Sequence, residues 1–215
     1  MTNCNNLVSL PSSIGRLKKL QKLNLSFCSK LTTLPASIGK LKNLQVLSLS
    51  VCPNLTTLPA SVGKLKNLQA LDLNYYNNLS PLPASIGQLK NLKKLNLYTA
   101  KITVLPANIG GLKNLQELNL GLCSKLTTLP ASIGQLKELQ KLDLRNCSNL
   151  TTLPASIGQL KKLQKLNLGL CSKLTTLPTS IGELKNLKKL HLRGTKIPKP
   201  TIEKLKKQLS RCRVF

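Results

Sequence analysis

Leucines recur at a fixed interval along nearly the whole chain. The step is 24 residues, as from Leu20 to Leu44, except for one step of 23 residues from Leu92 to Leu115. The leucines that keep this interval are Leu20, Leu44, Leu68, Leu92, Leu115, Leu139, Leu163 and Leu187. A strict period of this size is typical of a solenoid, in which each repeat packs against its neighbours. The chain is therefore predicted to be a stack of similar coils.

Within one coil the apolar residues follow two different periods. Leu23 and Leu25 alternate with polar residues, which predicts a short strand with one buried face. Pro35 then prevents a sheet from continuing, and Ile38 and Leu41 lie three apart, as on one face of a helical turn. A glycine inside that second segment favours a short or irregular helix. Each coil is predicted to pass from a strand through a turn into a short helical segment.

The resulting unit, LxxLxLxxCxxLxxLPxxIGxLxxL, begins at Leu20 and resembles leucine-rich repeat proteins of the cytosolic plant type. It is similar to the repeat regions of plant nucleotide-binding disease-resistance receptors and of the plant intracellular Ras-group-related repeat proteins. The pair Leu34-Pro35 differs from the GxIP-like turn of the extracellular plant class. The resemblance implies an α/β repeat solenoid, an arc with a parallel β-sheet on its concave face and short helical or 3-10 segments on its convex face.

The pattern divides the chain into three parts of one domain. Residues 1–19 match part of a repeat, residues 20–197 hold eight coils, and residues 198–215 are predicted to form a C-terminal capping helix with Thr201 as its N-cap. The apolar residues of this helix, spaced as on one face, are Ile202, Leu205, Leu209 and Cys212. No complete strand precedes Leu20, so the first coil is expected to expose an apolar edge. Self-association through that edge and truncation of a longer array are both open.

Charge is strongly one-sided, since 33 Lys and Arg residues stand against 6 acids, for a net charge of +27. One lysine position is filled in every coil, by Lys18, Lys42, Lys66, Lys90, Lys113, Lys137, Lys161 and Lys185. We call this row the lysine ladder. At a strand spacing of about 4.8 Å, two such charges repel in water by only about 0.9 kcal/mol, so the row needs no counter-ion. It is either a solubilising face or a stripe with weak, salt-sensitive affinity for nucleic acid or anionic lipid surfaces.

Cysteines also share one position of the repeat, at Cys28, Cys52, Cys123, Cys147 and Cys171, with Cys4 in line. Related repeats place asparagine there, and a small buried thiol is expected to replace it. Stacked side chains run parallel, which disfavours disulfides, and no CxxC or histidine cluster indicates a metal or other cofactor. Free cysteines, together with the lack of an apolar signal or membrane-spanning segment in the sequence, predict a cytoplasmic protein.

Residues between the leucines of each strand are expected to face outward on the concave side, where a partner would bind. The leading predicted contact residues form an apolar ridge with charged flanks: Phe27, Val51, Tyr75, Tyr98, Lys22, Asp72 and Lys94. A second, more charged group comprises Asp143, Arg145, His191 and Arg193. Tyr and Arg anchor many interfaces. The alternative is that these residues only cover the strand ends. Tyr76 stands at the cysteine position and is expected to be partly buried.

The inventory of reactive groups argues against an enzyme. The chain has one histidine and six acids, and it has no Gly-rich phosphate loop and no nucleophile with a placed base. The leading interpretation is a non-enzymatic protein–protein interaction module that binds a partner on its concave face. The resemblance to resistance receptors implies recognition of a pathogen-derived or guarded protein. The alternatives are a polyanion binder that uses the lysine ladder, and an engineered or truncated scaffold without an evolved partner.

Overall fold

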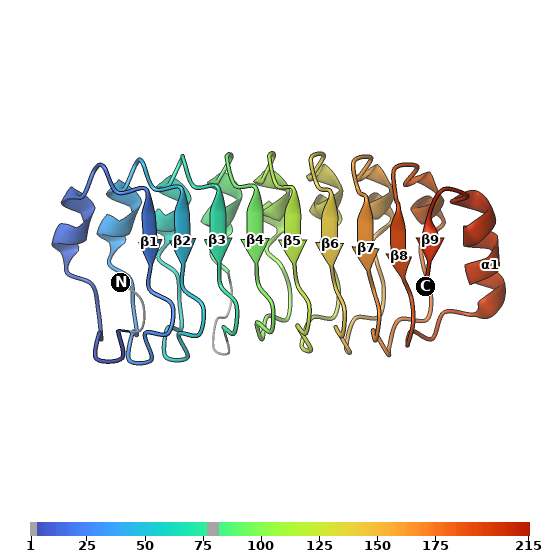
Figure 1. Ribbon diagram of the computed structural model, residues 1–215, viewed down its shortest axis with the longest axis horizontal. Coiled ribbons are helices and arrows are strands. Elements are labelled where there is room, and N and C mark those ends of the chain that lie inside the picture. Colours follow the sequence, from blue (N-terminus) through green and yellow to red (C-terminus); the bar gives the residue numbers. More distant parts are fainter. Residues whose placement is uncertain (1–3, 77–81) are drawn as a thin grey trace.

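The computed structural model describes residues 4–76 and 82–215, in which short strands alternate with short helices (Figure 1). The strands are β1 Lys22–Asn24, β2 Val46–Ser48, β3 Ala70–Asp72, β4 Lys94–Asn96, β5 Glu117–Asn119, β6 Lys141–Asp143, β7 Lys165–Asn167, β8 Lys189–His191 and β9 Arg213–Val214. The 3-10 helices are η1 Ser12–Arg16, η2 Ala36–Lys40, η3 Ala60–Lys64, η4 Ala84–Gln88, η5 Ala107–Gly111, η6 Ala131–Gln135, η7 Ala155–Gln159 and η8 Thr179–Glu183. One α-helix, α1, spans Lys199–Gln208.

The strands form one parallel sheet in the order of the sequence, from β1 to β9. Equivalent residues of successive coils pair with each other, as Leu23 pairs with Leu47 and Leu47 with Leu71. Figure 1 shows the strands side by side along the molecule, with the 3-10 helices in a second row behind them. The predicted fold class, a repeat solenoid with strands on one face and 3-10 segments on the other, is confirmed.

The interior is a continuous column of aliphatic side chains. In the second coil, Leu47, Leu49, Leu55, Val62 and Leu65 have no exposed surface, and the other coils repeat this arrangement. Removing such a side chain from water contributes about 1.5–3 kcal/mol. A three-residue strand buries only one leucine by itself, so each coil obtains its stability from the coils on either side.

The 3-10 helices stack so closely that one repeat position must be glycine. A Cβ atom on Gly39 would lie 2.5 Å from the carbonyl oxygen of Ser61 in the next coil. Gly63 and Gly134 meet Ser85 and Ser156 in the same way, also at 2.5 Å. Each helix follows a proline in extended conformation, such as Pro35 before η2. The predicted short helical segment is therefore a 3-10 helix whose glycine permits backbone stacking.

Each strand ends in a turn with an unusual backbone conformation. A buried leucine directly follows each of the strands from β1 to β8, as Leu25 follows β1. The residue two positions after this leucine is left-handed, with φ between 56° and 62°, in seven coils: Phe27, Val51, Tyr75, Thr99, Leu122, Asn146 and Leu170. Such a conformation costs a non-glycine residue about 1–2 kcal/mol. The main-chain N–H of each of these residues donates to a carbonyl of the next coil, as from Phe27 to Ser50 at 2.9 Å. The hydrogen-bond ladder thus continues past the strands and places these side chains in one row.

The C-terminal segment differs from the prediction in two respects. Helix α1 begins at Lys199, with Pro198 at its N-cap and Pro200 in its first turn, where proline is tolerated, and Thr201 lies inside the helix rather than at its N-cap. Cys212 lies beyond the helix, where the chain turns into β9 and pairs with β8. The expectation that Cys212 belongs to the helix face is therefore wrong. Leu205 and Leu209 are buried against the last coil.

At the other end, residues 1–3 of the predicted partial repeat lie outside the described residues. From Cys4 onward the chain forms η1, which stacks on η2, and a single bridge joins Ser9 to Thr33. Val8 and Leu17 are half exposed in this region. Self-association through the first coil stays a prediction.

Candidate functional site

Side chains on the strands form a charged row across the middle of the sheet face. Glu117 lies between two lysines on neighbouring strands, with its carboxylate 2.7 Å from Lys141 Nζ and 3.5 Å from Lys94 Nζ. The hydrogen bond from Lys141 lowers the pKa of the Glu117 carboxyl, and the charges of the two lysines add to this effect. Lys94 of the predicted site is therefore paired within the protein, whereas Lys22 on β1 is exposed.

Asparagine and aspartate on the strands stabilise the turns that follow. The Asp72 Oδ1 atom accepts hydrogen bonds from the Asn74 N–H at 3.1 Å and from Asn96 Nδ2 at 3.0 Å. Asp143 accepts the Arg145 N–H at 3.0 Å in the same manner. Four asparagines do the same in their own coils, namely Asn24, Asn96, Asn119 and Asn167. The predicted contact residue Asp72 thus has a structural role and is only half exposed.

The predicted apolar ridge lies along the ends of the strands. Phe27 and Tyr75 are 54% and 47% exposed, and Val51, between them in the row of left-handed residues, is half-buried. Tyr98 comes from the preceding position of its coil, and its ring meets that of Tyr75 edge-on at 6.1 Å between centroids. A pair of aromatic rings, with Tyr75 exposed and Tyr98 half-buried, therefore marks the middle of the row.

The structure joins the two predicted groups of contact residues. The guanidinium of Arg145 lies 5.3 Å from the centroid of the Tyr98 ring, across one intervening coil. That coil carries Gly121, where a Cβ would come within 3.0 Å of the Tyr98 ring and 3.3 Å of the Arg145 side chain. The Asp143 carboxylate also contacts Arg145, with 3.4 Å between Oδ2 and Nε. Tyr75, Tyr98 and Arg145 thus form one surface over four coils, and glycine makes it continuous.

Beyond Arg145 the sheet face is hollowed. A cavity of about 370 Å³ is lined by Arg145, Asn167, Gly169, Leu170, His191 and Arg193. Leu170 is 58% exposed here, and the His191 ring stacks on Phe215 with 4.5 Å between centroids. Sequence reasoning found Arg145, His191 and Arg193 but missed Gly169, Leu170 and Phe215 as parts of one site. The signal available in the sequence was the pair Gly169-Leu170, a residue without a side chain next to an apolar one shortly after the strand.

The cysteine position is buried and hydrogen-bonded to the neighbouring coil. The Cys147 thiol donates to the Leu120 carbonyl at 3.1 Å, and Cys171 donates to Leu144 at the same distance. Burial raises the pKa of Cys123 to about 12 and that of Cys171 to about 11, so these thiols stay protonated at neutral pH. Within the described residues no three His, Cys, Asp or Glu side chains gather as a metal site requires.

Tyr76, which replaces the cysteine of its coil, is completely buried rather than partly exposed. Its hydroxyl has no hydrogen-bond partner among the described residues, and burial raises its pKa. The ring takes the core position that a thiol takes in most other coils. Tyr76 therefore belongs to the core and not to the sheet surface.

The lysine ladder is exposed along the turns that lead from the 3-10 helices into the strands, and several of its members reach internal acceptors. Lys42 Nζ donates to the Gly39 carbonyl at 3.2 Å, Lys137 to Gln159 Oε1 at 3.2 Å, and Lys161 lies 2.9 Å from Glu183.

The next position of the repeat is asparagine in five coils, and each of these side chains donates to a main-chain carbonyl of the preceding coil: Asn43, Asn67, Asn91, Asn114 and Asn186. Sequence reasoning missed this second ladder, although the asparagine recurs visibly.

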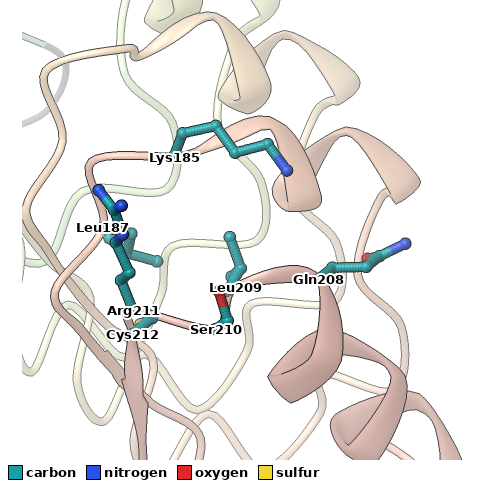
Figure 2. A pocket seen from close by; sticks show the side chains of 7 residues that line it. All are labelled: Lys185, Leu187, Gln208, Leu209, Ser210, Arg211 and Cys212. Carbon is teal, nitrogen blue, oxygen red and sulfur yellow. The ribbon is translucent and has the colours of Figure 1, made fainter.

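A second cavity lies between the last coil and the end of α1. Its volume is about 240 Å³, and its lining residues are Lys185, Leu187, Gln208, Leu209, Ser210, Arg211 and Cys212. Figure 2 shows Lys185 along one side and Arg211 at another, with Leu209 pointing between them. This cavity lies away from the sheet face, and none of the predicted partner-binding residues lines it.

Comparison with known proteins gives the family. A family model described as a leucine-rich repeat region matches residues 48–125 and 119–215, and a single leucine-rich repeat model matches residues 19–41. The chain belongs to the leucine-rich repeat family. Leucine-rich repeat domains generally mediate protein–protein interactions and are typically not enzymes. A search of the curated proteins finds no match.

Solved leucine-rich repeat structures are similar over most of the chain. The leucine-rich repeat domain of the type III effector XopL is 31% identical, with a TM-score of 0.82, over 97% of this chain and 72% of that one. A TDR receptor is 29% identical, with a TM-score of 0.68, over 86% of this chain and 32% of that one. The Arabidopsis receptor kinase HAESA is 28% identical, with a TM-score of 0.61, over 89% of this chain and 39% of that one. It was solved in complex with the peptide hormone IDA and the co-receptor SERK1. Among the described residues, no helix has the length and apolar character needed to cross a membrane.

Proposed function

We propose that this leucine-rich repeat chain is a non-enzymatic recognition module that binds a protein partner on its sheet face. The observation that carries the proposal is the continuous surface from Tyr75 through Tyr98 and Arg145 to Arg193, which we call the sheet-face site. Similar structures include a receptor kinase solved with a peptide hormone, and the family generally binds proteins.

Two physical features of the sheet-face site support binding. Tyrosine and arginine combine large contact area with polar groups, and a few such side chains carry most of the energy of many interfaces. The rings of Tyr75 and Tyr98 and the guanidinium of Arg145 are already held by one another and by Asp143. Side chains that are ordered before binding lose less conformational entropy when a partner docks.

The test is capture of partners from the source cells by wild-type and variant chains. We expect the Tyr98→Ala, Arg145→Ala double variant to lose most of a specific set of captured proteins, because both anchors are removed. The matched control is Lys66→Ala, which removes an exposed positive charge from the lysine ladder, outside the sheet-face site. Thermal unfolding of each variant shows whether the fold is intact. A folded double variant that captures the same proteins as wild type would refute the proposal.

Polyanion binding through the lysine ladder stays a prediction, as do cytoplasmic location and the closer likeness to plant disease-resistance receptors. The net charge of +27 favours some attraction to any polyanion. Such binding weakens steeply as salt rises, whereas contacts made by Tyr98 and its neighbours do not depend on counter-ion release. Capture that survives high salt supports the sheet-face site. A labelled DNA duplex that fails to bind even at low salt would remove the polyanion alternative.

A further inference from the structure

The hollow beside Arg145 has the features of an anchor pocket. Its volume of about 370 Å³ is at the small end of the range for ligand sites, about 300–1,000 Å³, and suits one or two side chains rather than a cofactor. Its floor is apolar, since Leu170 is exposed and Gly169 has no side chain. Two arginine side chains, those of Arg145 and Arg193, also line it.

The glycine at the floor is not required by the fold. A Cβ on Gly169 would meet Asn167 Oδ1 at 3.3 Å, a tight contact that requires the Asn167 side chain to shift by a few tenths of an ångström, and the Arg193 carbonyl at 3.6 Å, an ordinary van der Waals contact. Gly169 does not have a positive φ; among the described glycines, only Gly194 does. A side chain could therefore be accommodated by the backbone, and its absence keeps the cavity open.

The charges around the cavity are predominantly positive. Arg145 has one acidic neighbour, Asp143, whose Oδ2 lies 3.4 Å from Nε. Arg193 has no ion pair within the described part of the chain, and the Asn167 side chain can donate through its amide nitrogen while its oxygen accepts the Gly169 N–H. Arginine recognises carboxylates well because its donors match the geometry of the two oxygens.

We propose that this cavity binds an acidic side chain that lies next to an apolar one in a segment of the protein partner. The carboxylate would lie toward Arg145 and Arg193, and the apolar side chain would cover Leu170. This inference rests on the proposed function and specifies the chemistry of the partner. The charge complementarity of a chain with +27 net charge also favours an acidic segment over a neutral one.

The test uses three dipeptides that are acetylated and amidated, so that a carboxylate can come only from a side chain. N-acetyl-glutamyl-phenylalanine amide carries both features, the glutaminyl analogue lacks the charge, and N-acetyl-glutamyl-glycine amide lacks the apolar group. Binding is measured by NMR titration of the intact chain, following the main-chain amides of Gly169 and Leu170. We expect saturable shifts at these amides with the first peptide, and at least tenfold weaker binding of the other two.

Two variants and a control assign any binding to the cavity. Gly169→Leu should fill the cavity, and Arg193→Gln should remove one guanidinium. Each substitution is expected to lower the affinity for the first peptide at least fivefold. Lys66→Gln removes the same charge outside the cavity and should leave binding unchanged. Equal binding of the glutamyl and glutaminyl peptides, shifts confined to the lysine ladder, or no binding at all would overturn the inference.

These outcomes separate the inference from the proposed function. If partner capture depends on Tyr98 and Arg145 but no dipeptide binds at Gly169, the sheet-face site stands and the acidic anchor is wrong. If the dipeptide binds but capture is insensitive to the double variant, the cavity stands and the proposed function is wrong.

Discussion

The two faces of this leucine-rich repeat chain use their residues in opposite ways. On the convex side, coil after coil repeats one contact, in which a glycine such as Gly39, Gly63 or Gly134 lies against a serine carbonyl of the next 3-10 helix. On the sheet face, equivalent positions differ from coil to coil, as Asn74, Tyr98 and Arg145 do. The comparison indicates that stacking energy comes from the convex side and interior, whereas selectivity for a partner can vary on the sheet face with little effect on stability.

The largest effect is expected from a methyl group on the convex side. Gly134→Ala would place a Cβ 2.5 Å from the Ser156 carbonyl oxygen, so two coils must move apart. We expect a loss of roughly 2–3 kcal/mol of unfolding free energy, as for overpacked cores, measured by urea unfolding. Gly182→Ala is the control, because its Cβ would meet only the flexible end of Gln208 at 2.8 Å. Its effect should stay below about 1 kcal/mol, and equal losses would contradict backbone stacking.

A moderate effect is expected in the interior, where the thiols join the coils. Cys147→Ala removes a hydrogen bond to the Leu120 carbonyl and leaves a small void. The expected loss is roughly 1–2 kcal/mol of unfolding free energy. Cys212, which is only partly buried, provides the matched control and should tolerate alanine. If both substitutions changed the unfolding midpoint alike, the thiol row would have no special role in stacking.

The same thiols predict a dependence of stability on alkaline pH. Burial raises the pKa of Cys123 to about 12 and of Cys171 to about 11, from an ordinary value of 9.0. Above pH 9.0 the unfolded chain loses thiol protons that the folded chain keeps, so the free energy of unfolding should fall toward pH 11. In the Cys123→Ala, Cys171→Ala double variant this fall should be shallower. Parallel curves for wild type and variant, measured by urea unfolding at a series of pH values, would argue against buried, protonated thiols.

The smallest effect is expected on the sheet face itself. Glu117→Gln removes ion pairs with Lys94 and Lys141, which are largely exposed. Exposed ion pairs contribute about 0–1 kcal/mol, so the thermal midpoint should change little at neutral pH. Because the pKa of Glu117 is lowered in the folded state, whatever the pair contributes should disappear as the pH falls below its ordinary value of 4.5. A loss as large as that of Gly134→Ala would erase the contrast between the faces.

Parts of the structure followed from the spacing of residues, and others did not. The period of the leucines predicted the stacked coils, and the spacing within each coil predicted short strands and short helices, whereas the parallel sheet was implied by the resemblance to leucine-rich repeat proteins. The start of α1 was misjudged, since Pro198 takes the N-cap position and Pro200 fits the first turn, which leaves Thr201 inside the helix. Strand β9 was missed because Arg213–Val214 carries no repeat motif and forms a strand only beside β8.

The candidate site could be predicted only in pieces. Tyr98 and Arg145 were both recognised, yet their contact depends on Gly121, whose importance appears only when three coils are placed side by side. Tyr76 is a neighbour of Tyr75 in the chain, but one ring is buried in the core and the other is exposed. The left-handed turn after each strand makes this difference, and residue type alone does not reveal it.

The sequence by itself determined the repeat, its period, the residues of the interior and the basic charge of the surface, because these depend on local pattern and composition. Only the tertiary structure decided which varying residues meet, since stacking brings together side chains such as Tyr98 and Arg145 that lie two coils apart along the chain. It also decided that the lack of a side chain at Gly169 leaves a cavity open between two arginines. The physical reason is that burial selects residues one at a time, whereas a binding surface depends on distances between coils.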